Sequence, residues 1–154
     1  MRQAMIYLMI VAGLLFSVIN NACTPITLEY APVVSNNPDA AVVILRKCSD
    51  DLVKVHGSDY EYKISADKNS FSYSCIYKGS KASSEKPMGD TITINYKDVS
   101  LMELALLARP LGSHYHVIIY SSNDSVDRVR FTENKTAINF MNAVETLKQW
   151  NLAH

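Results

Sequence analysis

The sequence lacks an excess of charge of either sign and any motif that carries catalysis. Fifteen basic residues balance fifteen acidic ones, and removing the first 22 residues leaves fourteen against fifteen. A dedicated nucleic-acid binder needs a basic footprint to neutralise phosphates, so that class is excluded. The 154 residues contain no Gly-rich phosphate loop, no paired metal motif and no nucleophile elbow, and we expect no enzymatic activity and no cofactor.

The bulk composition is that of an ordinary globular protein. Apolar residues make up 48% of the chain and charged residues 19%, which argues against global disorder. The length suits one domain and is short for two. We therefore expect a single globular domain at residues 40–151, with one modest core.

The longest apolar run lies at the N-terminus. Residues 5–19 carry no charge, but fifteen residues are short for a membrane-spanning helix, which needs about 20. The run instead fits the apolar region of a signal peptide at residues 1–22, with Arg2 at its positive end. Asn20-Asn21-Ala22-Cys23 then resembles a bacterial lipobox. Ala22 matches that pattern, whereas Asn20 stands where lipoproteins usually have an aliphatic residue.

The lipoprotein resemblance implies a cellular location. Cys23 would carry a diacylglyceryl group and a further acyl chain such as palmitate, and two or more chains hold a protein stably on a membrane. Thr24 stands where an inner-membrane retention signal would have Asp. The resemblance thus favours the outer membrane of a bacterial cell envelope, with the domain facing the periplasm or the exterior. Two alternatives stay open: an uncleaved leader that serves as the anchor, and cleavage after Ala22 that leaves a free thiol.

The cysteine count is odd. In an oxidising compartment cysteines tend to pair, and a lipidated Cys23 leaves Cys48 and Cys75 as the pair. A disulfide between them would close 27 residues and contribute about 3–4 kcal/mol. The alternative is two buried thiols.

Residues 23–39 form the stretch between the leader and the domain. Pro25, Pro32 and Pro38 disfavour helix there, so we expect an extended tether that lifts the domain off the bilayer. An edge strand within residues 26–34 is the alternative.

Most of the remaining chain alternates apolar and polar residues with period two, which indicates antiparallel strands with one buried face. We expect an α+β fold, mainly antiparallel β, with about seven strands in a small barrel or sandwich and a C-terminal amphipathic helix. A long polar loop is expected at residues 78–90. The expected strands are residues 41–47, 52–56, 60–64, 71–77, 92–96, 114–121 and 129–131.

Two helices are expected. Ser100 and Glu103 have the spacing of a capping box, which predicts a helix at residues 101–108, although its continuous leucines also suit a buried strand. Asn134 is the expected cap of the final helix, whose apolar stripe has a 3.6-residue period and reaches Trp150. The stripe comprises Ala137, Phe140, Met141, Val144 and Leu147.

The order of these elements is similar to the pleckstrin-homology-like barrel. Val129-Arg130-Phe131, a short turn and a helix with Phe140 and Val144 resemble the strand and C-terminal helix that close one end of that barrel. The resemblance covers residues 40–150, and the helix expected after Ser100 departs from it. It implies binding and not catalysis, although fold alone assigns no function.

Histidines and tyrosines are the remaining candidates for a site. His114 and His116 project to one face of their strand and could hold Zn²⁺ or Cu²⁺ with a further ligand, for which His56 is the only candidate. Ordinary surface histidines are the alternative. Four tyrosines could face the core or line a groove, namely Tyr60, Tyr62, Tyr73 and Tyr77.

Together these patterns favour an exported, membrane-anchored lipoprotein whose domain binds or assembles an envelope protein. The alternative is a periplasmic domain that binds a small ligand or a metal. Nucleic acid is not expected as a partner.

Overall fold

The computed structural model describes residues 25–54, 60–77, 91–108 and 112–154. In this part of the chain seven antiparallel strands form two sheets. The first sheet has the order β1-β5-β6-β7, with β1 (Ile26–Leu28), β5 (Val99–Leu107), β6 (His114–Ser121) and β7 (Val126–Phe131). The second has the order β2-β3-β4, with β2 (Tyr60–Ala66), β3 (Ser70–Tyr77) and β4 (Thr91–Asn95). The expected α+β fold is confirmed.

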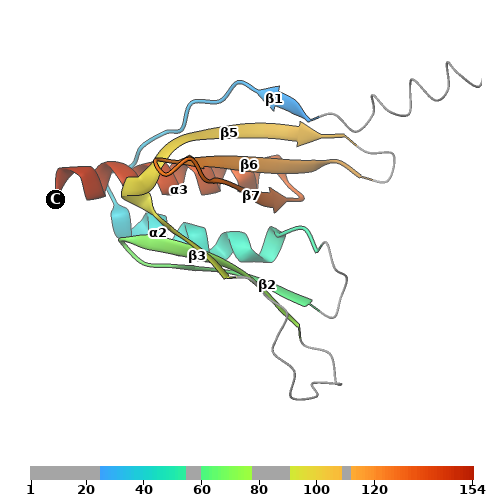
Figure 1. The fold of residues 1–154 in the computed structure, drawn as a ribbon, viewed down its shortest axis with the longest axis horizontal. Helices are drawn as coiled ribbons and strands as arrows, with labels where there is room; N and C mark the ends of the chain where they lie inside the picture. Colours follow the sequence, from blue (N-terminus) through green and yellow to red (C-terminus); the bar gives the residue numbers. More distant parts are fainter. Residues whose placement is uncertain (1–24, 55–59, 78–90, 109–111) are drawn as a thin grey trace, which may run out of the picture.

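The two sheets diverge from a short 3-10 helix, η2 (Tyr96–Asp98), that joins β4 to β5 (Figure 1). Helix α2 (Pro38–Lys47) lies between them in this view, and α3 (Asn134–Ala153) packs against α2 and against strands of both sheets. Phe140 of α3 is fully buried and contacts Phe71 of β3 edge-on, with ring centroids 5.4 Å apart. Its ring also lies 5.3 Å from Phe131 of β7. One side chain thus joins the helix to both sheets.

The predicted tether is in part built into the domain. Ile26 and Leu28 pair with Leu106 and Leu104 of β5, so the alternative of an edge strand is the one observed. The chain beyond β1 is held on α3, because Asn142 Oδ1 accepts hydrogen bonds from the Tyr30 hydroxyl and the Val33 amide, both at 2.7 Å. The expectation of an extended tether through residue 39 is therefore wrong for these residues.

The strand predicted at residues 41–47 is wrong, because this segment is helix α2. Asn37 caps the helix by accepting the Ala40 amide through its side chain, and Pro38 occupies the first turn. The helix buries Ala41, Val42 and Leu45. Basic residues in its last turn complement the helix dipole.

The strand predicted at residues 52–56 is also wrong in its described part, residues 52–54. Leu52 makes one isolated bridge to Phe131, and the Val53 amide donates to the Arg130 carbonyl at 2.9 Å. The segment follows a 3-10 helix, η1 (Cys48–Asp51), and lies along the end of β7. His56, the candidate third metal ligand, lies outside the described residues.

The helix predicted at residues 101–108 is strand β5, which was the alternative. Ser100 does not cap a helix, because its hydroxyl donates to the Tyr120 carbonyl of β6 at 2.8 Å. The leucine run suits a strand that is covered on both faces: Leu104 and Ala105 are adjacent, point to opposite faces, and are both buried.

The C-terminal helix is confirmed as α3, and its predicted stripe is fully buried from Ala137 to Leu147. Its cap differs from the prediction, since Glu133 and not Asn134 is the N-cap residue, and no side chain of the cap residue makes a capping bond. Asp51 instead binds the two residues that precede the helix. Its carboxylate accepts the Glu133 amide at 2.9 Å and the Thr132 hydroxyl. A carboxylate at this end of a helix is favoured by the dipole.

Among the residues that the structure describes, no helix combines the length and apolar character needed to cross a membrane. The predicted signal peptide at residues 1–22, Cys23 and the polar loop at residues 78–90 lie outside the described ranges.

Candidate functional site

His114 and His116 lie on β6 and share one face, as the strand pattern predicts. His116 is buried, and its cross-strand neighbours are Ala105 of β5 and Arg130 of β7. Nδ1 of the half-buried His114 is buried without a hydrogen-bond partner. No group of three metal-ligating side chains forms in the described part of the chain. An arginine opposite His116 disfavours a bound cation there.

Cys48 and Cys75 are free thiols, so the predicted disulfide is not present in the structure. Cys48 ends α2 and not a strand, and its Sγ points to the Thr136 carbonyl of α3 at 3.9 Å. Burial, with a smaller contribution from the Asp51 charge, raises the pKa of the Cys48 thiol to about 12. Cys75 lies on β3 opposite Tyr62, half-buried. The predicted pairing is based on cysteine parity in an oxidising compartment, and parity does not report which thiols lie close together.

The described tyrosines of β2 and β3 line the inner face of the second sheet. Tyr62 is buried, Tyr60 and Tyr73 are half-buried against the core, and the rings of Tyr62 and Tyr73 lie 6.3 Å apart. Burial raises the pKa of Tyr73, with Tyr62 and Cys75 adding to the shift and Arg130 opposing it. Core packing therefore accounts for these side chains. The side chain of Tyr77 lies outside the described set.

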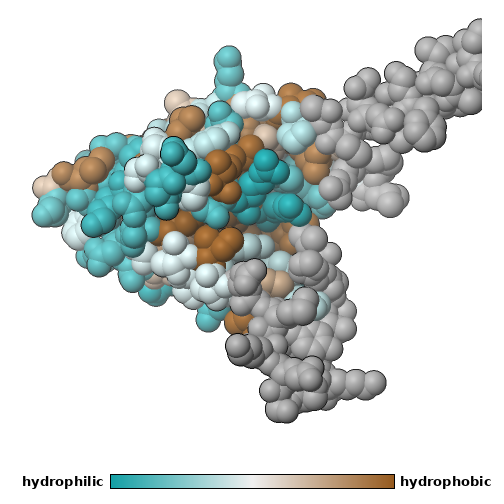
Figure 2. All heavy atoms as spheres, in the orientation of Figure 1, coloured by the Kyte–Doolittle hydropathy of each residue, from teal (hydrophilic) through white to brown (hydrophobic). Residues whose placement is uncertain are grey.

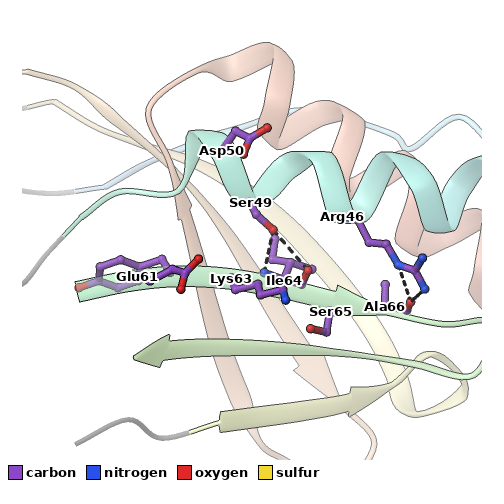
Figure 3. A pocket seen from close by; sticks show the side chains of 9 residues that line it. Arg46, Ser49, Asp50, Glu61, Lys63, Ile64, Ser65 and Ala66 are labelled. Carbon is purple, nitrogen blue, oxygen red and sulfur yellow. Dashed lines mark hydrogen bonds between the residues drawn. The ribbon is translucent and has the colours of Figure 1, made fainter. Parts of the chain in front are cut away.

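A groove of about 570 Å³ lies between α2, η1 and the outer edge of β2 (Figure 3). We name it the β2-edge groove. Charged residues of both signs line it, with Arg46 and Asp50 on the helical side and Glu61 and Lys63 on β2. The remaining lining residues are Ser49, Tyr62, Ile64, Ser65 and Ala66. Ligand pockets for small molecules are mostly apolar, so this lining suits a polar partner better.

The edge of β2 within this groove is closed by side chains. Ser49 Oγ accepts the Ile64 amide at 2.8 Å and donates to the Ile64 carbonyl at 3.3 Å. Arg46 donates two hydrogen bonds to the Ala66 carbonyl, at 3.0 and 2.6 Å (Figure 3). An exposed edge strand is a template for pairing with another chain, and these bonds remove that template at Ile64 and Ala66. A partner in the groove would therefore meet side chains at these two positions.

Sequence patterns did not single out Arg46 and Ser49. The signal that could have located them is the helix start at Asn37-Pro38-Asp39. Asn37 is a typical N-cap residue, and a proline followed by an acidic residue is typical of a first helical turn. With residues 38–47 recognised as a helix, Arg46 falls in its last turn and Ser49 just beyond.

A second cluster ties three elements together at the C-terminal end of α3. Lys68 Nζ lies 2.9 Å from Asp39 Oδ1 and 5.6 Å from the centre of the Trp150 ring. Asn151 donates to the Lys68 carbonyl at 2.6 Å, and His154 stacks on Trp150 at 4.9 Å. We name these five residues the far-end cluster. At this end of α3, Figure 2 shows a small hydrophobic group bordered by hydrophilic side chains.

A scan against protein-family models and searches of curated proteins and of solved structures found no match to this chain.

Proposed function

We propose that this chain is an exported bacterial lipoprotein, anchored through Cys23, whose domain binds a protein partner in the cell envelope without catalysing a reaction. One observation carries the proposal. An uncharged apolar run at residues 5–19 leads into Ala22-Cys23, and a strand of the folded domain begins at Ile26. The sequence thus moves from a leader to a domain in the order that an anchored protein requires.

The finer assignments belong to the same proposal. Thr24 after the lipidated Cys23 favours the outer membrane. The pleckstrin-homology-like relationship is supported by six strands, β2 to β7, followed by α3. It is weakened by α2, which occupies the place of the first strand, and by the absence of pairing between the two sheets in the described residues.

Mass spectrometry of the mature N-terminal peptide tests the anchor. A peptide that begins at Cys23 with the mass of a diacylglyceryl group and an added acyl chain would support lipidation. An intact Met1 would identify an uncleaved anchor, and an unmodified Cys23 would identify simple secretion. Either result would overturn the lipoprotein proposal.

The β2-edge groove is the surface that we propose for the protein partner, because four charged side chains of both signs gather there. A photo-crosslinker at Lys63, introduced in the cells that make the protein, should give one defined adduct. The same probe at Lys97, an exposed residue of η2, should not. The adduct should disappear when Glu61→Lys reverses a charge of the groove. Adduct formation that is equal at both positions would contradict this surface.

Ligand or metal binding stays the alternative, favoured by the unpartnered Nδ1 of His114 beside His116. Zinc titration of the protein, followed by calorimetry, tests it. A binding isotherm that is lost in His116→Ala would support the alternative. No isotherm, or one unchanged by the substitution, would exclude the metal version.

A further inference from the structure

The position of β1 fixes where the N-terminus leaves the domain. Ile26 pairs with Leu106, Leu106 pairs with Tyr115, and Tyr115 pairs with Phe131, so these four residues form one row across the first sheet. Figure 1 shows β1 beginning at the end of the molecule opposite the C-terminus. Ser113 precedes β6 at this end and is exposed, and the Ile26 side chain is 57% exposed. We name this end, with Ile26, Gly112, Ser113 and His114, the anchor end.

The chain between the lipid and the domain is short. Cys23 lies three residues before Ile26, and even a fully extended chain spans at most about 11 Å over that separation. The residues after β1 do not lengthen this connection, because Val33 and Ser35 donate amide hydrogen bonds to Asn142 and Thr146 of α3. The expected tether of residues 23–39 is thus reduced to the residues before β1.

We propose that the anchor end of the domain rests directly on the phospholipid surface, held there by the lipid on Cys23. This inference rests on the proposed lipidation. A connection of about 11 Å is shorter than the domain itself, so the domain cannot move away from the bilayer by its own length. The partner of the anchor end is therefore the headgroup layer of the bilayer. The attachment is covalent, so salt does not release the domain from the surface, in contrast to binding by exposed charges.

The same geometry directs the far-end cluster away from the membrane. Phe131 belongs to the row of four residues that marks the anchor end, and helix α3 begins three residues after it. The 20 residues of the helix extend about 30 Å. Trp150 lies sixteen residues after Asn134 along this helix, which corresponds to about 24 Å. Trp150 is the only tryptophan in the chain, which makes it a natural reporter for the far end.

Fluorescence quenching by lipid tests the orientation. The full-length lipidated protein is reconstituted into phosphatidylethanolamine and phosphatidylglycerol vesicles with a nitroxide on the headgroup. Trp150 should keep its fluorescence. In the double variant Ser113→Trp, Trp150→Phe the anchor-end tryptophan should lose at least half of its fluorescence, in low and in high salt alike. Ile26→Trp with Trp150→Phe is a second probe of the same end, and Gly112 is avoided because its φ of 135° disfavours a side chain.

A linker supplies the matched control. An insertion of about 20 Gly and Ser residues after Thr24 adds a mean reach of about 25 Å, so quenching of the anchor-end tryptophan should fall sharply. If the N-terminal mass shows lipidated Cys23 but both anchor-end probes escape quenching, or Trp150 is quenched equally, the orientation is wrong and the lipoprotein proposal stands. If the mass shows no lipid, both fail together. Circular dichroism of each variant establishes that it is folded before quenching is measured.

Discussion

Truncation of Phe140 should greatly lower the free energy of unfolding of the domain, because this ring contacts both sheets from α3. It is fully buried and packs against Phe71 and Phe131 at centroid separations of 5.4 and 5.3 Å. Replacing a buried Phe by Ala costs about 3–5 kcal/mol. Two aromatic contacts, each contributing about 0.5–1.5 kcal/mol beyond the buried area, place Phe140→Ala in the upper part of that range, at about 4–5 kcal/mol.

Urea unfolding followed by circular dichroism measures this loss. Phe140→Leu keeps most of the apolar volume and removes only the ring contacts, so it should cost about 1–3 kcal/mol. Leu152→Ala is the matched control on the same helix, since Leu152 is 62% exposed, and it should change stability by less than about 0.5 kcal/mol. A Phe140→Ala loss below about 2 kcal/mol, or a loss equal to that of Leu152→Ala, would refute the packing described for α3.

Three further outcomes follow from the polar contacts and the thiols. Ser49→Ala should lower the free energy of unfolding by about 1–2 kcal/mol in urea titrations, because the Ile64 amide and carbonyl lose their bonds to the Ser49 hydroxyl. The exposed Ser65→Ala should have little effect. Iodoacetamide should alkylate Cys75 in the native protein, whereas Cys48 should react only after unfolding. Peptide mass spectrometry measures both modifications. Equal modification of the two cysteines, or a bond between them, would contradict the burial of the Cys48 thiol. Backbone hydrogen bonds lower the pKa of Asp67, so its contribution to stability is present above the usual carboxyl pKa and disappears as pH falls through the lowered value. Thermal unfolding from pH 7 to 2 should therefore show a shallower acid decline in Asp67→Asn than in the natural protein, and an identical decline would argue against that contribution.

Sequence patterns predicted the elements in which local preference and burial agree. The alternation along β2 and β3 placed both strands, because every second residue faces the core. The stripe on α3 placed the last helix, because residues at its 3.6-residue spacing pack inward together. These elements have a single buried face, which a period in the sequence reports directly.

The errors came from elements whose burial is not one-sided. Helix α2 has Val43 and Ile44 exposed beside its buried residues, so its apolar run resembled a strand. Strand β5 is buried on both faces, so its leucines had no period of two and the chance spacing of Ser100 and Glu103 suggested a helix. Which segment covers which face is decided by tertiary packing, and a single sequence does not contain that information in any short window.

The candidate site was less predictable than the fold. The β2-edge groove combines residues of α2 and η1 with residues of β2, and within it Ser49 and Arg46 bind the backbone of that strand. The histidine pair was located correctly on one face of β6, but the buried state of His116 and its neighbour Arg130 depend on strand pairing. Periodicity reports the face of a residue and not the residues across from it.

The segment from β1 to Ser35 decides whether the domain sits at the membrane or on a long tether, and amide hydrogen exchange of residues 26–35 tests it most directly. In the structure this segment pairs with β5 and donates its Val33 and Ser35 amides to α3, so the peptide should exchange slowly in the natural protein. Asn142→Ala removes the acceptor of Val33 and should speed exchange around that residue. Exchange of the whole peptide at the rate of an unstructured chain would contradict the built-in strand, and with it the close approach of the anchor end to the bilayer.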